Sequence, residues 1–232
     1  MQSNSADAVR ADLDASQLSA SQLYHPPKGK PWARWLLARL GWQVRFAGLP
    51  QTAGRSCGVI IAYPHTSNWD GFIGVLTIWA LGIKLRLWGK ASLFRIPGLA
   101  AILRSAGAVP VERTGARASR GVVADTVAAM RAEPVFWLGL SPEGTRKHIP
   151  GWRTGFYHVA CQAEVPVGIA YLDWKNKRIG VTQFLWMTGD IARDFERIAA
   201  AYVGVTGCRP ENAAPIAPLA ASFDRDNAVV KA

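Results

Sequence analysis

The stretch of sequence that decides the fold reads GVIIAYPHTSNWDGFIGVLTIWALGIKLRLWGK and covers residues 58–90. Its first seven residues, 58–64, form an apolar run that predicts a buried strand. Residues 71–82 have the length and composition of a helix, and residues 85–90 have the pattern of a second strand. A strand, a helix and a strand in succession predict α/β layering with a largely parallel sheet.

The same alternation continues along the chain. Strands are predicted at 107–113, 134–142, 165–173 and 177–186, and helices at 99–104, 116–131, 154–163 and 191–202. We therefore predict one α/β domain over residues 31–207, with a mixed, mostly parallel sheet flanked by helices. Residues 1–30 and 208–232 are rich in Ala, Ser, Pro, Asp and Asn and show little periodicity, which predicts flexible ends.

Charge and cysteine content restrict the class of protein. The chain carries 27 Lys and Arg against 16 Asp and Glu, a net charge of +11, and residues 31–113 alone carry +8. This excess favours a polyanion, an anionic membrane surface or a phosphorylated small molecule as partner. Cys57, Cys161 and Cys208 are widely spaced and odd in number, which argues against a disulfide framework and favours a reducing compartment.

The segment PWARWLLARLGWQVRF opens with Pro31 and predicts an amphipathic helix over residues 31–41. Its apolar face comprises Trp32, Trp35, Leu36 and Leu40, with Arg34, Arg39 and Arg45 nearby. Such a helix either lies in a membrane interface or packs on the core. The longest charge-free apolar stretch, 71–83, is shorter than the roughly 20 residues of a spanning helix, and residues 1–30 lack the apolar run of a signal peptide.

A first candidate site is PHTSNWD, in which His65 follows a predicted strand and Asp70 stands where the next helix begins. Histidine titrates near neutral pH, and a carboxylate at its second nitrogen fixes the tautomer of a general base. The two side chains can meet only if a turn lies between them, because residues five apart on a helix point about 140° away from each other. The alternative is that Asp70 caps the helix and His65 is an ordinary loop residue.

Two further candidates also follow predicted strands. In SPEGTR, 141–146, Gly144 permits a sharp turn and Arg146 offers a guanidinium that suits phosphate. In VPVER, 109–113, Arg113 stands just beyond the strand. Each is explained equally well, on its own, as a plain loop or an exposed surface arginine.

Taken together, these blocks resemble the glycerolipid acyltransferase family, which includes bacterial 1-acyl-sn-glycerol-3-phosphate (lysophosphatidate) acyltransferases. The resemblance covers residues 58–172 and rests on the segments that stand in this order: His65-x4-Asp70, Val111-Glu112-Arg113, Pro142-Glu143-Gly144-Thr145-Arg146 and Val165-Pro166-Val167. It implies transfer of a fatty acyl group from acyl-CoA or acyl-carrier protein to a lysophospholipid hydroxyl, in phospholipid biosynthesis, without a metal or other cofactor. By that analogy His65 is the general base, Asp70 orients it, and the acceptor side is formed by Arg113, Glu143, Gly144, Thr145 and Arg146.

The sequence departs from the family pattern in two places. Ile169 stands where the fourth block often carries a second proline, so Pro166 receives no role beyond shaping the pocket. Glu112 occupies a variable position, and its role stays open. The resemblance to members without a spanning segment implies peripheral attachment at the cytoplasmic side of the cell membrane.

The sequence leaves several alternatives open for the acceptor and for the activity. The acceptor is either phosphate-bearing or a phosphate-free lysolipid such as an acylated amino acid, and a noncatalytic lipid-binding protein would share the basic and aromatic surface. Ser67 beside His65 would suit a hydrolase, but no G-x-S-x-G elbow is present. The remaining histidines lack the spacing of metal ligands, and the basic residues accompany no nucleic-acid-binding motif, so we expect neither a metal nor a nucleic acid as partner.

Overall fold

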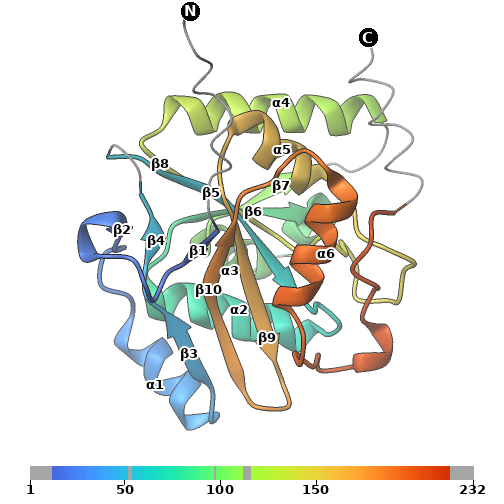
Figure 1. Cartoon of the computed structure of the whole chain (residues 1–232). Helices are drawn as coiled ribbons and strands as arrows, with labels where there is room; N and C mark the ends of the chain where they lie inside the picture. Colours follow the sequence, from blue (N-terminus) through green and yellow to red (C-terminus); the bar gives the residue numbers. More distant parts are fainter. Residues whose placement is uncertain (1–11, 52–53, 97, 112–115, 220–232) are drawn as a thin grey trace, which may run out of the picture.

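A computed structural model describes residues 12–51, 54–96, 98–111 and 116–219. Its centre is an eight-stranded sheet in the order β1-β10-β9-β5-β8-β6-β7, with β3 also paired to β10 (Figure 1). The strands are β1 Leu13–Asp14, β3 Gln43–Phe46, β5 Ser56–Tyr63, β6 Leu85–Lys90, β7 Ala108–Val111, β8 Val135–Leu140, β9 Val167–Asp173 and β10 Arg178–Leu185. A small second sheet pairs β2, Leu23–Tyr24, with β4, Leu49–Pro50.

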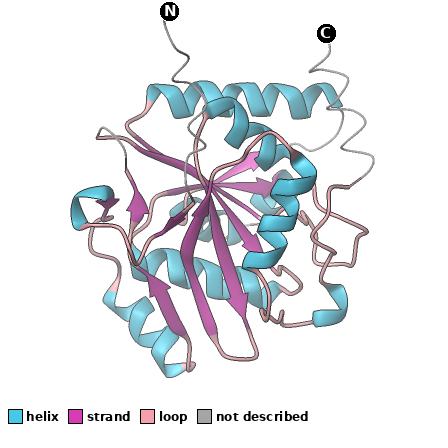
Figure 2. Ribbon diagram, in the orientation of Figure 1, coloured by secondary structure: helices cyan, strands magenta, loops and turns pink. Residues whose placement is uncertain are grey.

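The sheet is mixed but mostly parallel, which confirms the predicted fold class. The five strands β9, β5, β8, β6 and β7 run parallel to one another, whereas β10 is antiparallel to β9 and to β1. The helices cover both faces (Figure 2). They are α1 Pro31–Arg39, α2 Asn68–Leu81, α3 Leu99–Ser105, α4 Ala116–Ala132, α5 Gly155–Ala163 and α6 Ile191–Ala201, with short 3-10 turns at Ala20–Gln22, Ala91–Arg95 and Pro210–Asn212.

Side-chain alternation along β5 divides the core between the two faces of the sheet. Val59 and Ile61 pack in the larger cluster with residues of α4, α5 and α6, whereas Ile60 belongs to a second cluster on the opposite face. A third cluster joins α1 and α2 to the sheet residues Leu172 and Ile179. Because successive strand side chains point to opposite faces, an uninterrupted apolar run is what a strand covered on both sides requires.

Helix α1 is present, and it begins at Pro31 as the sequence predicts but ends at Arg39. Its buried residues are Ala33 and Leu37, which pack in the cluster shared with α2. Trp32 and Trp35 are 49% and 65% exposed. The packing face of this helix is therefore centred on Ala33 and Leu37, beside the predicted apolar face, and Trp32, Trp35 and Leu40 of that predicted face lie largely outside the core.

Helix α2 begins at Asn68, three residues before the predicted start. The cause is local: the Ser67 hydroxyl accepts a hydrogen bond from the backbone N–H of Trp69, and Asp70 completes a capping box by accepting from the Ser67 N–H. Polar caps of this kind satisfy the donors that the first helical turn leaves unpaired. The helix ends at Leu81, and the residue that follows it, Gly82, has a left-handed φ of 69°.

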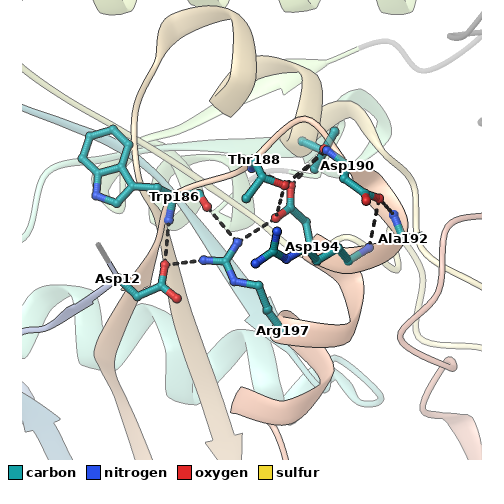
Figure 3. Close-up of polar contacts among 9 residues, drawn as sticks. Asp12, Trp186, Thr188, Asp190, Ala192, Asp194 and Arg197 are labelled. Atoms are coloured by element: carbon teal, nitrogen blue, oxygen red, sulfur yellow. Dashed lines mark hydrogen bonds and ion pairs between the residues drawn. The ribbon is translucent and has the colours of Figure 1, made fainter. Parts of the chain in front are cut away.

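The amino-terminal end differs from the prediction of a flexible segment over residues 1–30. Within its described part, β1 pairs with β10, and Ala15 and Leu23 are buried. The Asp12 carboxylate accepts from the guanidinium of Arg197, which also donates to buried Asp194 at 2.7 Å (Figure 3). These few apolar and charged contacts hold a segment whose composition alone suggested disorder.

The carboxyl-terminal end also differs from the predicted flexible tail over 208–232. In its described part, the Trp152 N–H donates to the Ala217 carbonyl, the Leu219 N–H donates to the Trp152 carbonyl, and Ala214 is 1% exposed. The segment folds back over the loop that follows β8, and its backbone forms hydrogen bonds with residues of that loop. Residues 208–219 therefore make hydrogen bonds with the domain that the sequence predicts to end at residue 207.

Candidate active site

The site lies at the carboxyl ends of the parallel strands β5 and β8. His65 follows β5, and Glu143 follows β8, its hydrogen-bonded neighbour. Nδ1 of His65 lies 3.9 Å from Oδ2 of Asp70, with the imidazole 22% exposed and the carboxylate fully buried. The turn needed to bring the two side chains together is formed by residues 65–67, just before α2. Carboxyl ends of strands in open α/β sheets are where ligands usually bind.

Asp70 serves as both a capping residue and a partner of His65. Its Oδ2 accepts hydrogen bonds from the backbone N–H groups of Thr66 at 2.6 Å and Ser67 at 2.7 Å. Burial raises the pKa of Asp70, while these hydrogen bonds, a bond from Trp174 and the charge of Arg146 oppose that rise. The same buried carboxylate therefore caps α2 and lies beside the imidazole of His65.

Glu143 is 2% exposed, and its carboxylate holds backbone groups together. Oε2 accepts from the N–H of His65 at 2.6 Å, and Oε1 accepts from the N–H of Ala214 at 3.1 Å. Burial raises the pKa of Glu143. This geometry differs from the expected place on the acceptor side, because both oxygens face the backbone and clamp the loop that carries His65.

The remaining residues of the PEGTR segment form a turn at the protein surface. Gly144 has a φ of 63°, a left-handed conformation that suits glycine, and its N–H donates to the Ser141 carbonyl. Thr145 is half-buried, and its hydroxyl accepts from the N–H of Lys147 at 3.3 Å. Arg146 is exposed, and its charge acts on Asp70. Arg113 and Glu112 lie outside the described residues.

The carboxyl-terminal segment supplies contacts that the sequence analysis missed. The N–H of Arg209 donates to the Thr66 hydroxyl at 3.0 Å, and the Tyr63 hydroxyl donates to the Ala214 carbonyl at 3.0 Å. His65 therefore lies in a loop held on one side by Glu143 and on the other by residues 143 and 151 positions further along the chain than their partners.

Trp174 is a second residue that the sequence analysis missed. It directly follows β9, and its indole Nε1–H donates to Oδ1 of Asp70 at 2.7 Å. The signal available in the sequence was its position, because a residue just after a parallel strand stands at the same edge of the sheet as His65.

The described residues narrow the alternatives. The Ser67 hydroxyl caps α2 through Trp69, which explains this serine without a nucleophilic role. Among the described residues, no group of three or more His, Cys, Asp or Glu side chains is arranged to hold a metal ion. A search of the same residues for a helix long and apolar enough to cross a membrane finds none.

Comparison with known proteins identifies the family. The crystal structure of the 1-acyl-sn-glycerophosphate acyltransferase PlsC from Thermotoga maritima superposes with a TM-score of 0.47 and 15% sequence identity, over 75% of this chain and 78% of that chain. No curated protein sequence matches significantly. The acyltransferase family model matches residues 44–169, which is more than half of the 232 residues. The matched region includes His65, Asp70 and the PEGTR segment, and the chain belongs to the acyltransferase family.

Proposed function

We propose that the protein transfers a fatty acyl group from an acyl thioester to a hydroxyl of a lysophospholipid such as 1-acyl-sn-glycerol-3-phosphate, in phospholipid biosynthesis. The observation that carries this proposal is the pairing of His65 with Asp70 at the edge of the sheet, with Nδ1 and Oδ2 3.9 Å apart, inside the region that matches the acyltransferase family. Catalytic hydrogen bonds are often long without substrate and shorten when the reacting groups bind.

The chemistry assigns a role to each nitrogen of the imidazole. With Nδ1 protonated and directed at Asp70, Nε2 is the base that removes the proton of the acceptor hydroxyl. The hydroxyl oxygen then attacks the thioester carbonyl carbon, and the C–S bond breaks as the new ester C–O bond forms. His65 returns its proton to the departing thiolate, and Asp70 stabilises the imidazolium between the two steps.

Arg146 supports a phosphate-bearing acceptor. Its guanidinium is exposed, and it is close enough to the catalytic pair for its charge to lower the pKa of Asp70. Guanidinium groups bind phosphate oxygens through paired, charge-assisted hydrogen bonds. The expected second cation, Arg113, lies outside the described residues.

The lipid acceptor implies contact with a bilayer, and we place this contact at α1 and α2. These helices pack together, with the Trp32 and Trp79 rings 5.4 Å apart. Both helices carry exposed apolar side chains: Trp32 and Trp35 on α1, and Trp69 and Phe72 on α2. Trp69 is 61% exposed and Phe72 is 43% exposed. Trp69 lies only four residues after His65 in the chain, so docking at Trp69 and Phe72 brings the catalytic base to the lipid surface.

The membrane proposal predicts two dependences. Apolar side chains add affinity in proportion to the area buried, and cations near an anionic leaflet add about 1 kcal/mol each, an attraction that salt screens. Binding to vesicles should therefore rise with anionic lipid and fall with salt, and the double variant Trp32→Glu, Trp35→Glu should lose it while remaining folded. Binding that ignores both charge and these tryptophans would place the docking surface elsewhere.

The function is tested by supplying acyl-CoA and acyl-carrier-protein thioesters with lysolipids that carry or lack a phosphate, and resolving the products. Wild-type protein should acylate a lysophospholipid, and His65→Ala should lower the rate by about 10²- to 10⁴-fold, as expected for the loss of a general base. Acylation of only phosphate-free lysolipids would redirect the acceptor assignment. Vesicle binding without any transfer would favour a noncatalytic lipid-binding protein.

A further inference from the structure

Trp174 occupies an unusual position between the catalytic carboxylate and the end of α1. Its Nε1–H donates to Oδ1 of Asp70 at 2.7 Å, and its backbone N–H donates to the Thr206 carbonyl at 2.8 Å. Its ring packs edge-to-face against Trp42, with centroids 5.0 Å apart and planes at 89°. Trp42 follows α1 and is buried among residues of α1 and α2. The indole is therefore fixed through its backbone and its ring.

The hydrogen bond from Trp174 determines how the Asp70 carboxylate is oriented. Oδ2 faces His65 and accepts from the N–H groups of Thr66 and Ser67, whereas Oδ1 accepts from the Trp174 indole. Anchors on opposite oxygens prevent rotation of the carboxylate about its Cβ–Cγ bond. Without the indole, a buried oxygen loses its donor, which is costly for a charged group.

We propose that Trp174 is a positioning residue for acyl transfer: its indole N–H holds the Asp70 carboxylate so that Oδ2 stays directed at His65, and edge-to-face packing against Trp42 holds the indole in place. This inference rests on the proposed function, because it assigns Asp70 the task of orienting a catalytic base. It adds a residue from beyond β9, outside the four sequence blocks that carry the resemblance to the family.

Several charged groups act on Asp70 besides Trp174. His65 lies 3.9 Å away, the positive charge of Arg146 lowers the pKa of Asp70, and buried Glu143 is close enough to interact with it through its charge. The Trp174 hydrogen bond also lowers the pKa of Asp70. Removing the indole donor should therefore raise that pKa while the other three groups remain in place.

The experiment compares Trp174→Phe, which keeps an aromatic ring but removes the donor, with Trp137→Phe as a matched control. The Trp137→Phe substitution also removes a buried indole hydrogen bond, which Nε1–H of Trp137 donates to the Ser56 hydroxyl at 3.0 Å. Ser56 lies at the opposite end of β5 from His65. Carbon-13 NMR follows the titration of the Asp70 carboxyl, assigned with Asp70→Asn. Steady-state acyl transfer is measured on the same proteins across pH.

In Trp174→Phe, the Asp70 titration and the acidic limb of the kcat profile should both move to higher pH. The value of kcat should fall about tenfold, as expected for one charge-assisted hydrogen bond, with little change in KM. Trp137→Phe should lose melting temperature only. If Trp174→Phe behaves like this control, with an unmoved Asp70 titration, the indole is a packing residue and the proposal is overturned.

A measurement on the wild type keeps the proposal testable if Trp174→Phe does not fold. Among the ten tryptophan indole N–H resonances, one should move downfield as Asp70 ionises, and its absence would overturn the proposal. This titration is independent of acyl transfer. Wild-type protein that shows the coupled titration but acylates none of the tested acceptors would refute the proposed function and leave the hydrogen-bond assignment standing.

Discussion

The double role of Asp70 leads to a quantitative prediction for Asp70→Asn. The carboxylate accepts three hydrogen bonds, from Thr66 and Ser67 at Oδ2 and from Trp174 at Oδ1. An asparagine amide has one oxygen, and its NH₂ group cannot accept a hydrogen bond. Whichever way the amide turns, at least one buried donor is left unpaired, and the negative charge opposite His65 is lost.

The magnitude follows from these contacts. A hydrogen bond to a charged group contributes about 1.5–3 kcal/mol, which for a chain of this length corresponds to a fall in melting temperature of about 3–12 °C. The same range expressed as transition-state stabilisation gives a loss in kcat of about 10- to 100-fold, because each 1.36 kcal/mol is a factor of ten in rate. This loss is smaller than that expected for His65→Ala, because the imidazole base survives.

The matched control is Ser67→Ala, which removes the hydroxyl cap of α2 and leaves the Asp70 carboxylate and His65 intact. Loss of such a cap costs about 0.5–2 kcal/mol of stability. The assay is acyl transfer per folded molecule, with the folded fraction taken from thermal unfolding of the same sample. If Asp70→Asn retains full activity per folded molecule and differs from Ser67→Ala only in melting temperature, Asp70 is a capping residue alone.

Other predictions concern the neighbours of this pair. Glu143→Gln should lower the melting temperature by about 2–12 °C, because one of the buried N–H groups of His65 and Ala214 loses its acceptor, and circular dichroism will measure it. Burial raises the pKa of both Glu143 and Asp70. Their contribution to the free energy of unfolding is therefore fully present below their ordinary pKa values near 4, and it is lost as pH rises through the raised values. The stability of the wild type relative to Glu143→Gln should be greatest at acid pH, and a constant difference across pH would contradict this. Arg146→Ala should raise KM for a phosphate-bearing acceptor more than KM for the thioester, and equal changes in steady-state kinetics would remove Arg146 from phosphate binding.

The fold class could be predicted from the sequence because each main element carries its own periodicity. The run from Ser56 to Tyr63 is apolar because β5 is covered on both faces, and the α2 segment is apolar because it packs against α1 and the sheet. Apolar periodicity begins at Gly71 and so predicts a start three residues late, whereas α2 begins at Asn68, directly after the capping residue Ser67. Caps are set by single polar side chains, which periodicity does not detect.

The candidate site was predictable only where its chemistry resides in side chains with a recognisable spacing. His65, Asp70 and the PEGTR segment have such a spacing. The contacts that hold His65 in place do not, because Glu143 binds the backbone N–H of Ala214, and Thr66 accepts from the backbone N–H of Arg209. Any residue other than proline offers an N–H at those positions.

Backbone donors of this kind explain why composition predicts a flexible tail for an Ala- and Pro-rich segment that makes contacts in its described part, residues 208–219. Its contribution to the site is its path, which brings the N–H groups of Arg209 and Ala214 to the loop between β5 and α2. Trp174 is the intermediate case, because its indole is a distinctive donor but its partner lies 104 positions earlier in the chain. The position of the His65 and Asp70 pair therefore depends on long-range backbone contacts. Proline removes the backbone N–H, so Arg209→Pro and Ala214→Pro should lower acyl transfer per folded molecule without changing any residue of the sequence motifs.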